Sequence, residues 1–333
     1  MKNLSTLFVL GALAGGVLLT GCSKSKTAAT PAAGQDPAAG STTATADPAS
    51  PADLKIHWAA GKVFPMRMDL TQTTETHAPN QPDPEKQEVK LAQDFDLSAL
   101  QQLDNGGWEF GLQFKSETLD VSAGGHSLVS FDSAQSRAQD GDNPAAPILR
   151  AMIGAHLQYF TDPAGKVEKM GGMDDLLHRI NAAAKPEQRA MFQQMYNEDT
   201  LKQYGSFADA LPNRIVNVGE SWPVKYDLSS PIGTLTMDLK STFKNWEQHN
   251  GRLCAHIETT GKISSKTVSA AMVGAAVEIE KGKISGDVWF DPKPGMVVDL
   301  HNNQDMTLKI ATRTQTLQQG LNVKVRLSSV DAG

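Results

Sequence analysis

The sequence contains two cysteines in 333 residues, too few for a disulfide framework. It also lacks an excess of basic residues, because 31 lysines and arginines against 37 aspartates and glutamates leave a net charge of −6. That balance excludes the basic patch by which proteins bind nucleic acids or anionic head groups. The long apolar run at Leu7–Leu19 is shorter than the roughly 20 residues that a membrane-spanning helix needs.

Familiar catalytic motifs are also missing. The sequence holds no His-Glu-x-x-His, no Gly-x-Ser-x-Gly and no phosphate-binding Walker loop. We therefore predict a protein that is not an enzyme, with no catalytic, cofactor-binding or metal-binding residue. An enzyme whose site residues are dispersed along the chain stays open as the least favoured alternative, because motifs detect clustered residues only.

One cluster of metal-ligating residue types stands out late in the chain. Cys254 and His256 are two residues apart and would share one face of a strand, and His249 lies shortly before them. Zinc requires three or four ligands in a fixed geometry, and no fourth is evident. We favour a solvent-facing strand surface, of which Arg252 and Glu258 would be the flanking members.

Four further features have structural explanations that compete with functional ones. Asp140–Asn143 offers clustered oxygens for calcium but lacks the EF-hand spacing, so a surface turn is favoured. Asp162 and Asp291 could form a carboxylate pair, yet each precedes a proline and then a glycine, as in hairpin turns. Trp222 is expected in the core rather than at a ligand. The alanine-rich segment 268–277 is compatible with a buried strand, a small helix or a flap.

The amino-terminus resembles the export signal of bacterial lipoproteins. Lys2 precedes the apolar run, and Leu19-Thr20-Gly21-Cys22 is similar to a lipobox. The resemblance implies that residues 1–21 are removed and that acyl chains such as palmitate on Cys22 anchor the protein in a membrane. Ser23, where an aspartate would mark inner-membrane retention, implies the outer membrane with the body in the periplasm.

Residues 23–53 contain no aromatic residue and no valine, leucine, isoleucine or methionine. Such a stretch cannot bury enough apolar surface to offset its ordering entropy, so we predict a disordered tether over residues 22–53. The body that follows is divided into a first β half (54–172), a helical segment (173–211) and a second β half (212–333).

The two β halves carry the same features in the same order. Each has a Gly-x-x-aromatic-Pro-x-basic-x-Asp-Leu stretch, then an Asn-Gly turn, then an aromatic residue followed by Asp-Pro and a glycine. The matching pairs are Gly61–Leu70 with Gly219–Leu228, Asn105-Gly106 with Asn250-Gly251, and Phe160–Gly165 with Phe290–Gly295. Three matches in one order indicate two related halves.

Alternation of apolar and polar residues predicts antiparallel strands with one wet face, as at Phe64, Met66, Met68 and Leu70. Between the halves the apolar period becomes helical at Met173–Ile180, after Pro186 and from Leu201 to Leu211, with a shorter helix near Pro147–Met152. We predict a mainly β fold with inserted helices (α+β). Its two antiparallel β-meander halves form curved sheets or an incomplete barrel, with helices packed on one face.

Leu211-Pro212 followed by Val216-Asn217-Val218-Gly219-Glu220-Ser221-Trp222 resembles the signature of an uncharacterised family of bacterial envelope lipoproteins. The resemblance implies fold and location but no activity. The leading hypothesis is binding of an apolar ligand or a protein partner, with neither cofactor nor nucleic acid. The second is a structural role in envelope assembly or maintenance without a ligand. A cavity of several hundred cubic ångströms would favour the first, and a filled core the second.

Overall fold

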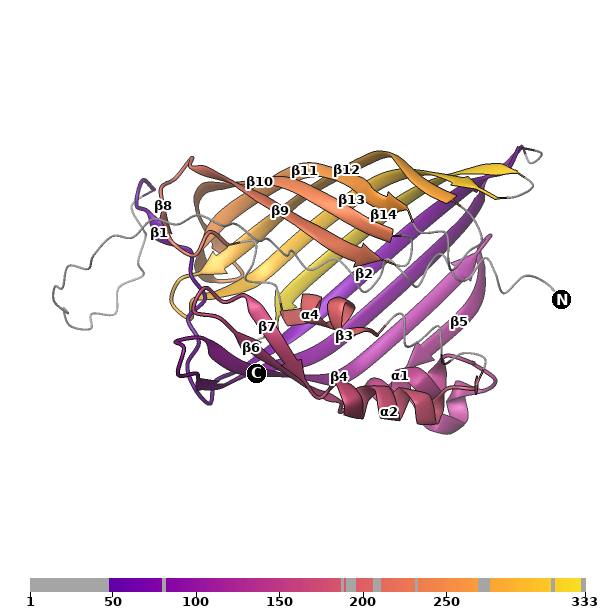
Figure 1. The fold of residues 1–333 in the computed structure, drawn as a ribbon, viewed down its shortest axis with the longest axis horizontal. Helices are drawn as coiled ribbons and strands as arrows, with labels where there is room; N and C mark the ends of the chain where they lie inside the picture. Colours follow the sequence, from indigo (N-terminus) through magenta and orange to yellow (C-terminus); the bar gives the residue numbers. More distant parts are fainter. Residues whose placement is uncertain are drawn as a thin grey trace.

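The computed structural model describes residues 48–79, 82–186, 189, 196–205, 211–230, 233–268, 276–312 and 315–330. Figure 1 shows a strongly curved antiparallel sheet with a few short helices beside it. Cys22, most of the predicted tether and the segment 269–275 lie outside the described residues. No described helix is long and apolar enough to cross a membrane.

A single large sheet of 12 strands forms the body, in the order β7-β6-β4-β3-β2-β14-β13-β12-β11-β10-β9, and β5 pairs with β4 beside this path. Every pairing is antiparallel. The first-half strands are β2 (Val63–His77), β3 (Glu85–Gln102), β4 (Trp108–Ala123), β5 (His126–Asp132), β6 (His156–Thr161) and β7 (Val167–Gly171). The second-half strands are β9 (Ser221–Ser230), β10 (Gly233–His249), β11 (Arg252–Val268), β12 (Ala276–Asp291), β13 (Met296–Ala311) and β14 (Thr316–Ser329).

The two halves have matching strand orders. In the first, β2, β3, β4, β6 and β7 lie side by side, and in the second β9 to β13 do the same, with β14 added. The halves join because β14, the last strand, pairs with β2, the first long strand. The outer strands β7 and β9 do not pair with each other, so the sheet is an incomplete barrel. The predicted fold class is confirmed, and one continuous sheet replaces the alternative of two.

The predicted helices occur between the halves and near Pro147. They are α1 (Ala146–Met152), α2 (Met173–Ala183) and α4 (Glu198–Gly205), with a short 3-10 helix η2 (Arg137–Asp140) before them. Leu176 and Ile180 of α2 are fully buried four residues apart, which is the spacing of one helix face. Pro186 is helical as predicted, whereas most of the segment after it lies outside the described residues.

The turns follow the predicted glycines, with one difference in type. Asn250 and Gly251 both have positive φ, 49° and 75°, as a two-residue type I′ hairpin requires. Between β3 and β4 the loop is longer, and Gly106 is left-handed at φ 84° while Asn105 is not. The second Asn-Gly pair therefore makes the predicted tight turn, and the first belongs to a wider loop.

A small second sheet lies at one end of the incomplete barrel (Figure 1). It pairs β1 (Ala52–Asp53) with β8 (Ile215–Val216). Ala52 and Leu54 are buried, and the His57 amide donates to the Gly295 carbonyl at 2.8 Å. The predicted tether thus overlaps the folded body, because its last two residues form β1 and gain a hydrogen-bonded partner.

Candidate functional site: the concave face

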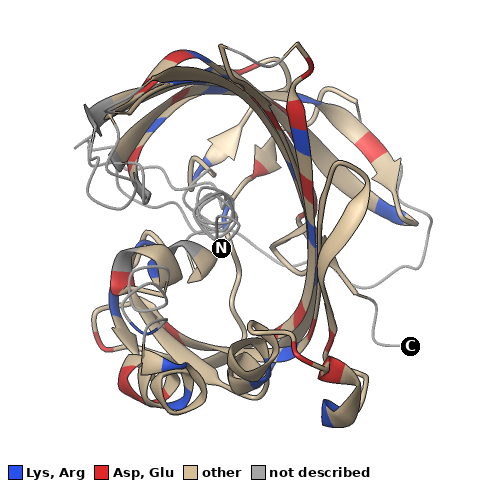
Figure 2. Cartoon of the chain, turned by 90° about the vertical axis from the view of Figure 1, so that its right-hand side faces the viewer, with Lys and Arg blue, Asp and Glu red and all other residues tan. Residues whose placement is uncertain are grey.

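The concave face of the sheet is lined by side chains from both halves. Its buried residues join those of the three helices in one core cluster, which places that face on the inside of the curve (Figure 2). One row crosses eight strands, each residue opposite the next. In order it contains Glu117, Gln93, Met68, Leu327, Leu300, Val288, Ile257 and Phe243. The row is polar at its β4 end and apolar from β2 onward.

Four buried polar atoms on this face have no hydrogen-bond partner among the described residues. They are Gln72 Oε1, Thr74 Oγ1, Glu117 Oε2 and Gln319 Oε1. These residues are 1–7% exposed, so bulk solvent does not reach them. Because an unsatisfied buried group costs about 1–3 kcal/mol, natural cores hold few of them. Four of the five such atoms among the described residues therefore gather on this face.

Glu117 belongs to a hydrogen-bonded group with Gln93 and Tyr204. The Tyr204 hydroxyl of α4 donates to Gln93 Oε1 at 3.2 Å, and the Gln93 side chain hydrogen-bonds to the Glu117 carboxyl group. Burial raises the pKa of Glu117 to about 8, although the bond from Gln93 lowers it. The carboxyl group is therefore mostly protonated at neutral pH, and it can donate a hydrogen bond as well as accept one.

A β-bulge turns Glu117 inward. Strand β4 is out of register with β3 at this point, because Asp94 pairs with Ser116 and Phe95 with Phe114, which leaves Lys115 as the extra residue. Phe114 and Glu117 consequently both face the core despite their odd spacing. The bulge lies where β4 exchanges one partner strand for another, β6 up to Gln113 and β5 from Thr118.

Helix α4 lies across the opening between the outer strands, since it contacts both β7 and β9. The Tyr159 hydroxyl of β6 donates to the Leu201 carbonyl at 2.9 Å and fixes the helix from one side. Tyr204 reaches into the curve, where its ring meets Phe95 and Phe114 edge-on at centroid distances of 6.5 and 5.7 Å. The helix therefore covers the concave face and supplies one of its polar side chains.

The convex face carries a different cluster. The rings of His249 and His256 stack on Trp289, at centroid distances of 4.1 and 5.2 Å. Asp299 is fully buried beside them and accepts bonds from Arg326 and from His249 Nε2 at 2.8 and 2.9 Å. Burial raises the pKa of Asp299, but these bonds outweigh burial and hold the pKa below its ordinary value. Asp299 therefore has partners within this cluster, whereas the adjacent His301 Nε2 lies 3.3 Å from Asp299 Oδ1 and is buried without a hydrogen bond among the described residues.

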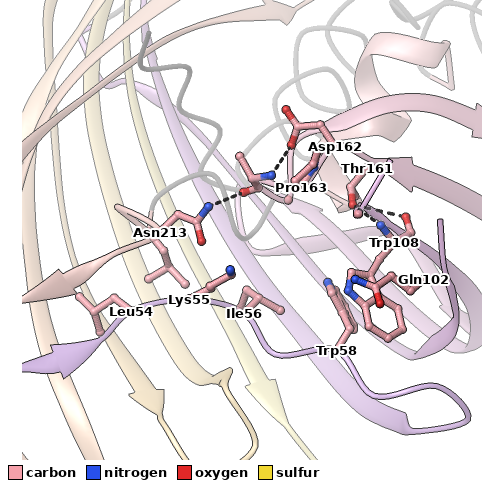
Figure 3. A pocket seen from close by; sticks show the side chains of 14 residues that line it. Leu54, Lys55, Ile56, Trp58, Gln102, Trp108, Thr161, Asp162, Pro163 and Asn213 are labelled. Atoms are coloured by element: carbon pink, nitrogen blue, oxygen red, sulfur yellow. Dashed lines mark hydrogen bonds between the residues drawn. The ribbon is translucent and has the colours of Figure 1, made fainter. Parts of the chain in front are cut away.

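Two cavities are lined by described residues. Figure 3 shows the first, of about 120 Å³, where Trp58, Trp108 and Asn213 surround the turn at Asp162. The second, of about 250 Å³, is an open hollow between the ends of β2 and β14. Neither has the several hundred cubic ångströms that ligand pockets usually have. The volumes of these two cavities therefore do not support the ligand hypothesis. The observation in its favour is the set of buried polar atoms without partners among the described residues.

Most of the residues that the sequence offers as possible binding or metal sites have structural roles in the fold. Asp162 Oδ1 accepts the amides of Ala164 and Lys166, and Asp291 Oδ1 accepts that of Lys293, as hairpin turns require. Trp222 is buried in the core at the start of β9, as predicted. Asp140 is bound by Arg150 and closes a surface turn.

The expected metal candidate is also a structural element. Within the described residues no group of three histidines, cysteines, aspartates or glutamates could hold a metal ion. Cys254 corrects the prediction of a solvent-facing strand surface, because it is fully buried with Trp289 and Val298. Trp289 and Val298 were not expected on the outer surface, and together with Cys254 they form a small apolar cluster there. Burial raises the pKa of the Cys254 thiol to about 12, so it stays protonated.

Comparison with known proteins gives a family without an activity. A model described as a family of unknown function (DUF6263) matches residues 105–297, which is more than half of the chain. The match covers the strands from β4 to β12, the helices and the Leu211–Trp222 motif. No curated protein matches the sequence.

Two solved structures are similar at low identity. A structure of lipovitellin and its lipid–protein interactions is 8% identical with a TM-score of 0.46, and it covers 82% of this chain. The chain spans 25% of that lipovitellin chain. A DUF1329 family protein from Desulfovibrio piger is 6% identical with a TM-score of 0.13, covering 81% of this chain and 86% of its own. Both TM-scores are too low to carry an argument about ligands.

Proposed function

The chain belongs to DUF6263, a family of unknown function, and from that premise we propose that it binds an apolar ligand on the concave face of its incomplete barrel. The binding is non-enzymatic. The observation that carries the proposal is the set of four buried polar atoms that have no partner among the described residues, on a mainly apolar face. A core that is permanently filled by its own side chains would lose stability at each of them.

A structural or partner-binding role without a ligand is the second candidate. Its support is the size of the two cavities, about 120 and 250 Å³, which are small for an apolar ligand. Under this proposal the same face would be a permanent core, and the four atoms would remain unsatisfied in the working protein.

We further propose that the body is held at the outer membrane by acyl chains on Cys22, facing the periplasm. The lipobox-like residues before Cys22 support this, and two or three acyl chains give stable anchoring. Cys22→Ala should move the protein from the membrane fraction to the soluble fraction. Protein that still sediments with membranes after a salt wash would contradict the anchor.

Ligand binding is tested by native mass spectrometry on the full chain with Cys22→Ala, purified without detergent from two expression hosts. We expect a defined additional mass that organic solvent removes, because a filled concave face satisfies its polar atoms. Bare protein from both hosts would favour the structural role. A matched control is the same chain with Met68→Glu, which places a charge in the apolar row and should abolish the additional mass.

A further inference from the structure

We infer that the ligand is a neutral amphiphile, with an acyl chain along the apolar row and a hydroxyl or amide group at Glu117. This inference rests on the proposed function and names its ligand class. It derives from three features of the concave face, namely its charge, the donors and acceptors at one end, and the continuity of the apolar track.

The charge of the face excludes an ionised phosphate. Among the residues whose burial the structure describes, no lysine or arginine is buried. Glu117 is the one acidic residue in the row that crosses the concave face, and Tyr204 and Tyr196 are the titratable groups that interact with it. A phosphate placed there would lose its hydration without gaining a cation, which is strongly unfavourable.

The unpartnered atoms match a hydroxyl or an amide, which both donates and accepts. Glu117 Oε2 lacks a partner, whereas the other part of the carboxyl group is held by Gln93 and, through it, by Tyr204. Gln72 Oε1 and Gln319 Oε1 are also without partners among the described residues, but they lie four and eight residues further along β2 and β14 than the row that contains Glu117, so they do not contact this polar group. A hydroxyl or amide can bond to Glu117 Oε2 whichever oxygen of the carboxyl group carries the proton, whereas an ionised phosphate can only accept.

The apolar row provides the track for the chain of the ligand. From Met68 to Phe243 it crosses six strands without a polar side chain. At a strand spacing of roughly 4.8 Å, the five spacings between these strands give a curved apolar row roughly 24 Å long. An oleoyl chain is shorter than this track, so the polar end can stay at Glu117 while the whole chain is covered.

The test is a binding panel on the full chain with Cys22→Ala, measured by displacement of a fluorescent fatty alcohol. The probes are monooleoylglycerol, oleoyl lysophosphatidic acid, which differs from it by the phosphate, and oleylamine. We expect monooleoylglycerol to bind about 100-fold more tightly than the phosphate compound, because no cation offsets the buried charge. Equal affinity of these two, or tightest binding of oleylamine, would overturn the inference and leave the proposed function standing.

Three variants assign the selectivity to Glu117. Glu117→Gln keeps size and hydrogen bonding and should change monooleoylglycerol affinity less than about threefold, whereas Glu117→Leu should weaken it about tenfold, as loss of one buried hydrogen bond does. Ser241→Ala is the control, because the Ser241 hydroxyl is buried on the same face but already bonded to Thr259 at 2.9 Å.

If Glu117→Leu does not fold, Glu117→Lys replaces it. A cation at the end of the row should shift selectivity toward the phosphate compound, which a purely structural glutamate would not do. Unchanged selectivity in the soluble variant would overturn the inference. A protein that binds none of the three probes overturns the proposed function itself.

Discussion

On the convex face of the sheet, buried carboxylates accept hydrogen bonds from neighbouring strands, whereas on the concave face four buried polar atoms have no partner among the described residues. Glu109 is bonded by Gln101 and Gln158, Asp299 by Arg326 and His249. The concave Glu117, in contrast, keeps one oxygen without a partner. The two surfaces belong to the same strands, so strand geometry does not explain the difference.

The comparison separates polar groups that stabilise the fold from polar groups that, under the proposed function, a ligand would satisfy. A convex pair such as Asp299 and Arg326 stabilises the fold because both groups are supplied by the chain. A concave atom such as Gln72 Oε1 has no partner among the described residues, and its burial lowers the stability of the ligand-free fold.

The largest expected effect is the pH dependence of stability that Glu117 introduces. Burial raises its pKa to about 8 from 4.5, so between these values the folded protein holds a proton that the unfolded chain has lost. Stability should therefore fall as the pH rises from about 4.5 to about 8, by on the order of a few kcal/mol, and stay low above that. Glu117→Gln should remove this fall.

Chemical denaturation of both proteins at about pH 5 and about pH 9 measures the effect. The difference between them isolates Glu117, because the convex ion pairs titrate equally in both. Parallel pH profiles would show that Glu117 is already ionised, or solvated, in the folded protein.

On the convex face, Asp299→Ala should cost about 3 kcal/mol of unfolding free energy, because it leaves Arg326 and His249 without their buried acceptor. Thermal melting of the variant measures this. The matched control is Asp305→Ala, on the same strand but exposed, which should change stability by less than about 0.5 kcal/mol. A melting temperature equal to that of the parent would mean that the convex cluster does not stabilise the fold.

The most direct contrast between partnered and unpartnered groups involves two glutamines in one row. Gln72 and Gln304 both lie opposite Val323, one on each side, and each is 1% exposed. Gln304 Nε2 donates to Asn302 at 3.3 Å, whereas Gln72 Oε1 has no partner among the described residues. In delipidated protein, Gln304→Leu should lower stability by about 1 kcal/mol and Gln72→Leu should raise it by up to about 1 kcal/mol.

Chemical denaturation of the two variants and the parent measures these changes in unfolding free energy. If both substitutions lower the unfolding free energy by a similar amount, Gln72 is hydrogen-bonded within the chain. The contrast between partnered and unpartnered groups would then not hold at this position.

The smallest expected effect comes from the tether. Removal of residues 28–46 should change the unfolding free energy by less than about 0.5 kcal/mol, because this composition buries almost no apolar surface. Melting temperatures of the shortened and parent proteins measure it. A clear drop would identify the chain's own tether as what completes the concave face.

Local patterns in the sequence predict the strands and turns of this fold well. Phe64, Met66, Met68 and Leu70 alternate as expected, and all four are buried. The two related halves are also recognisable in the sequence, because each carries the same turn residues in the same order. The closure of the body by β14 and β2 has no local signal, since Leu327 and Met68 pair across almost the whole chain.

The candidate site was not predictable from alternation. Counting in twos from Phe114 places Glu117 on the solvent side, and only the extra residue Lys115 turns it inward. For Cys254, alternation along β11 correctly predicts the convex face. It does not predict that Trp289, on a neighbouring strand, buries the thiol there. Both outcomes depend on pairings between distant strands.

The central claim, that the ligand lies on the concave face, is tested most directly by photocrosslinking with a diazirine analogue of monooleoylglycerol and residue-level mass spectrometry. Strand β14 provides the internal comparison, since Val323 and Val325 are buried while Lys324 and Arg326 alternate with them. The account predicts labels on Val323, Val325 or Met68. Labels on Lys324 or Arg326, or no label at all, would contradict it.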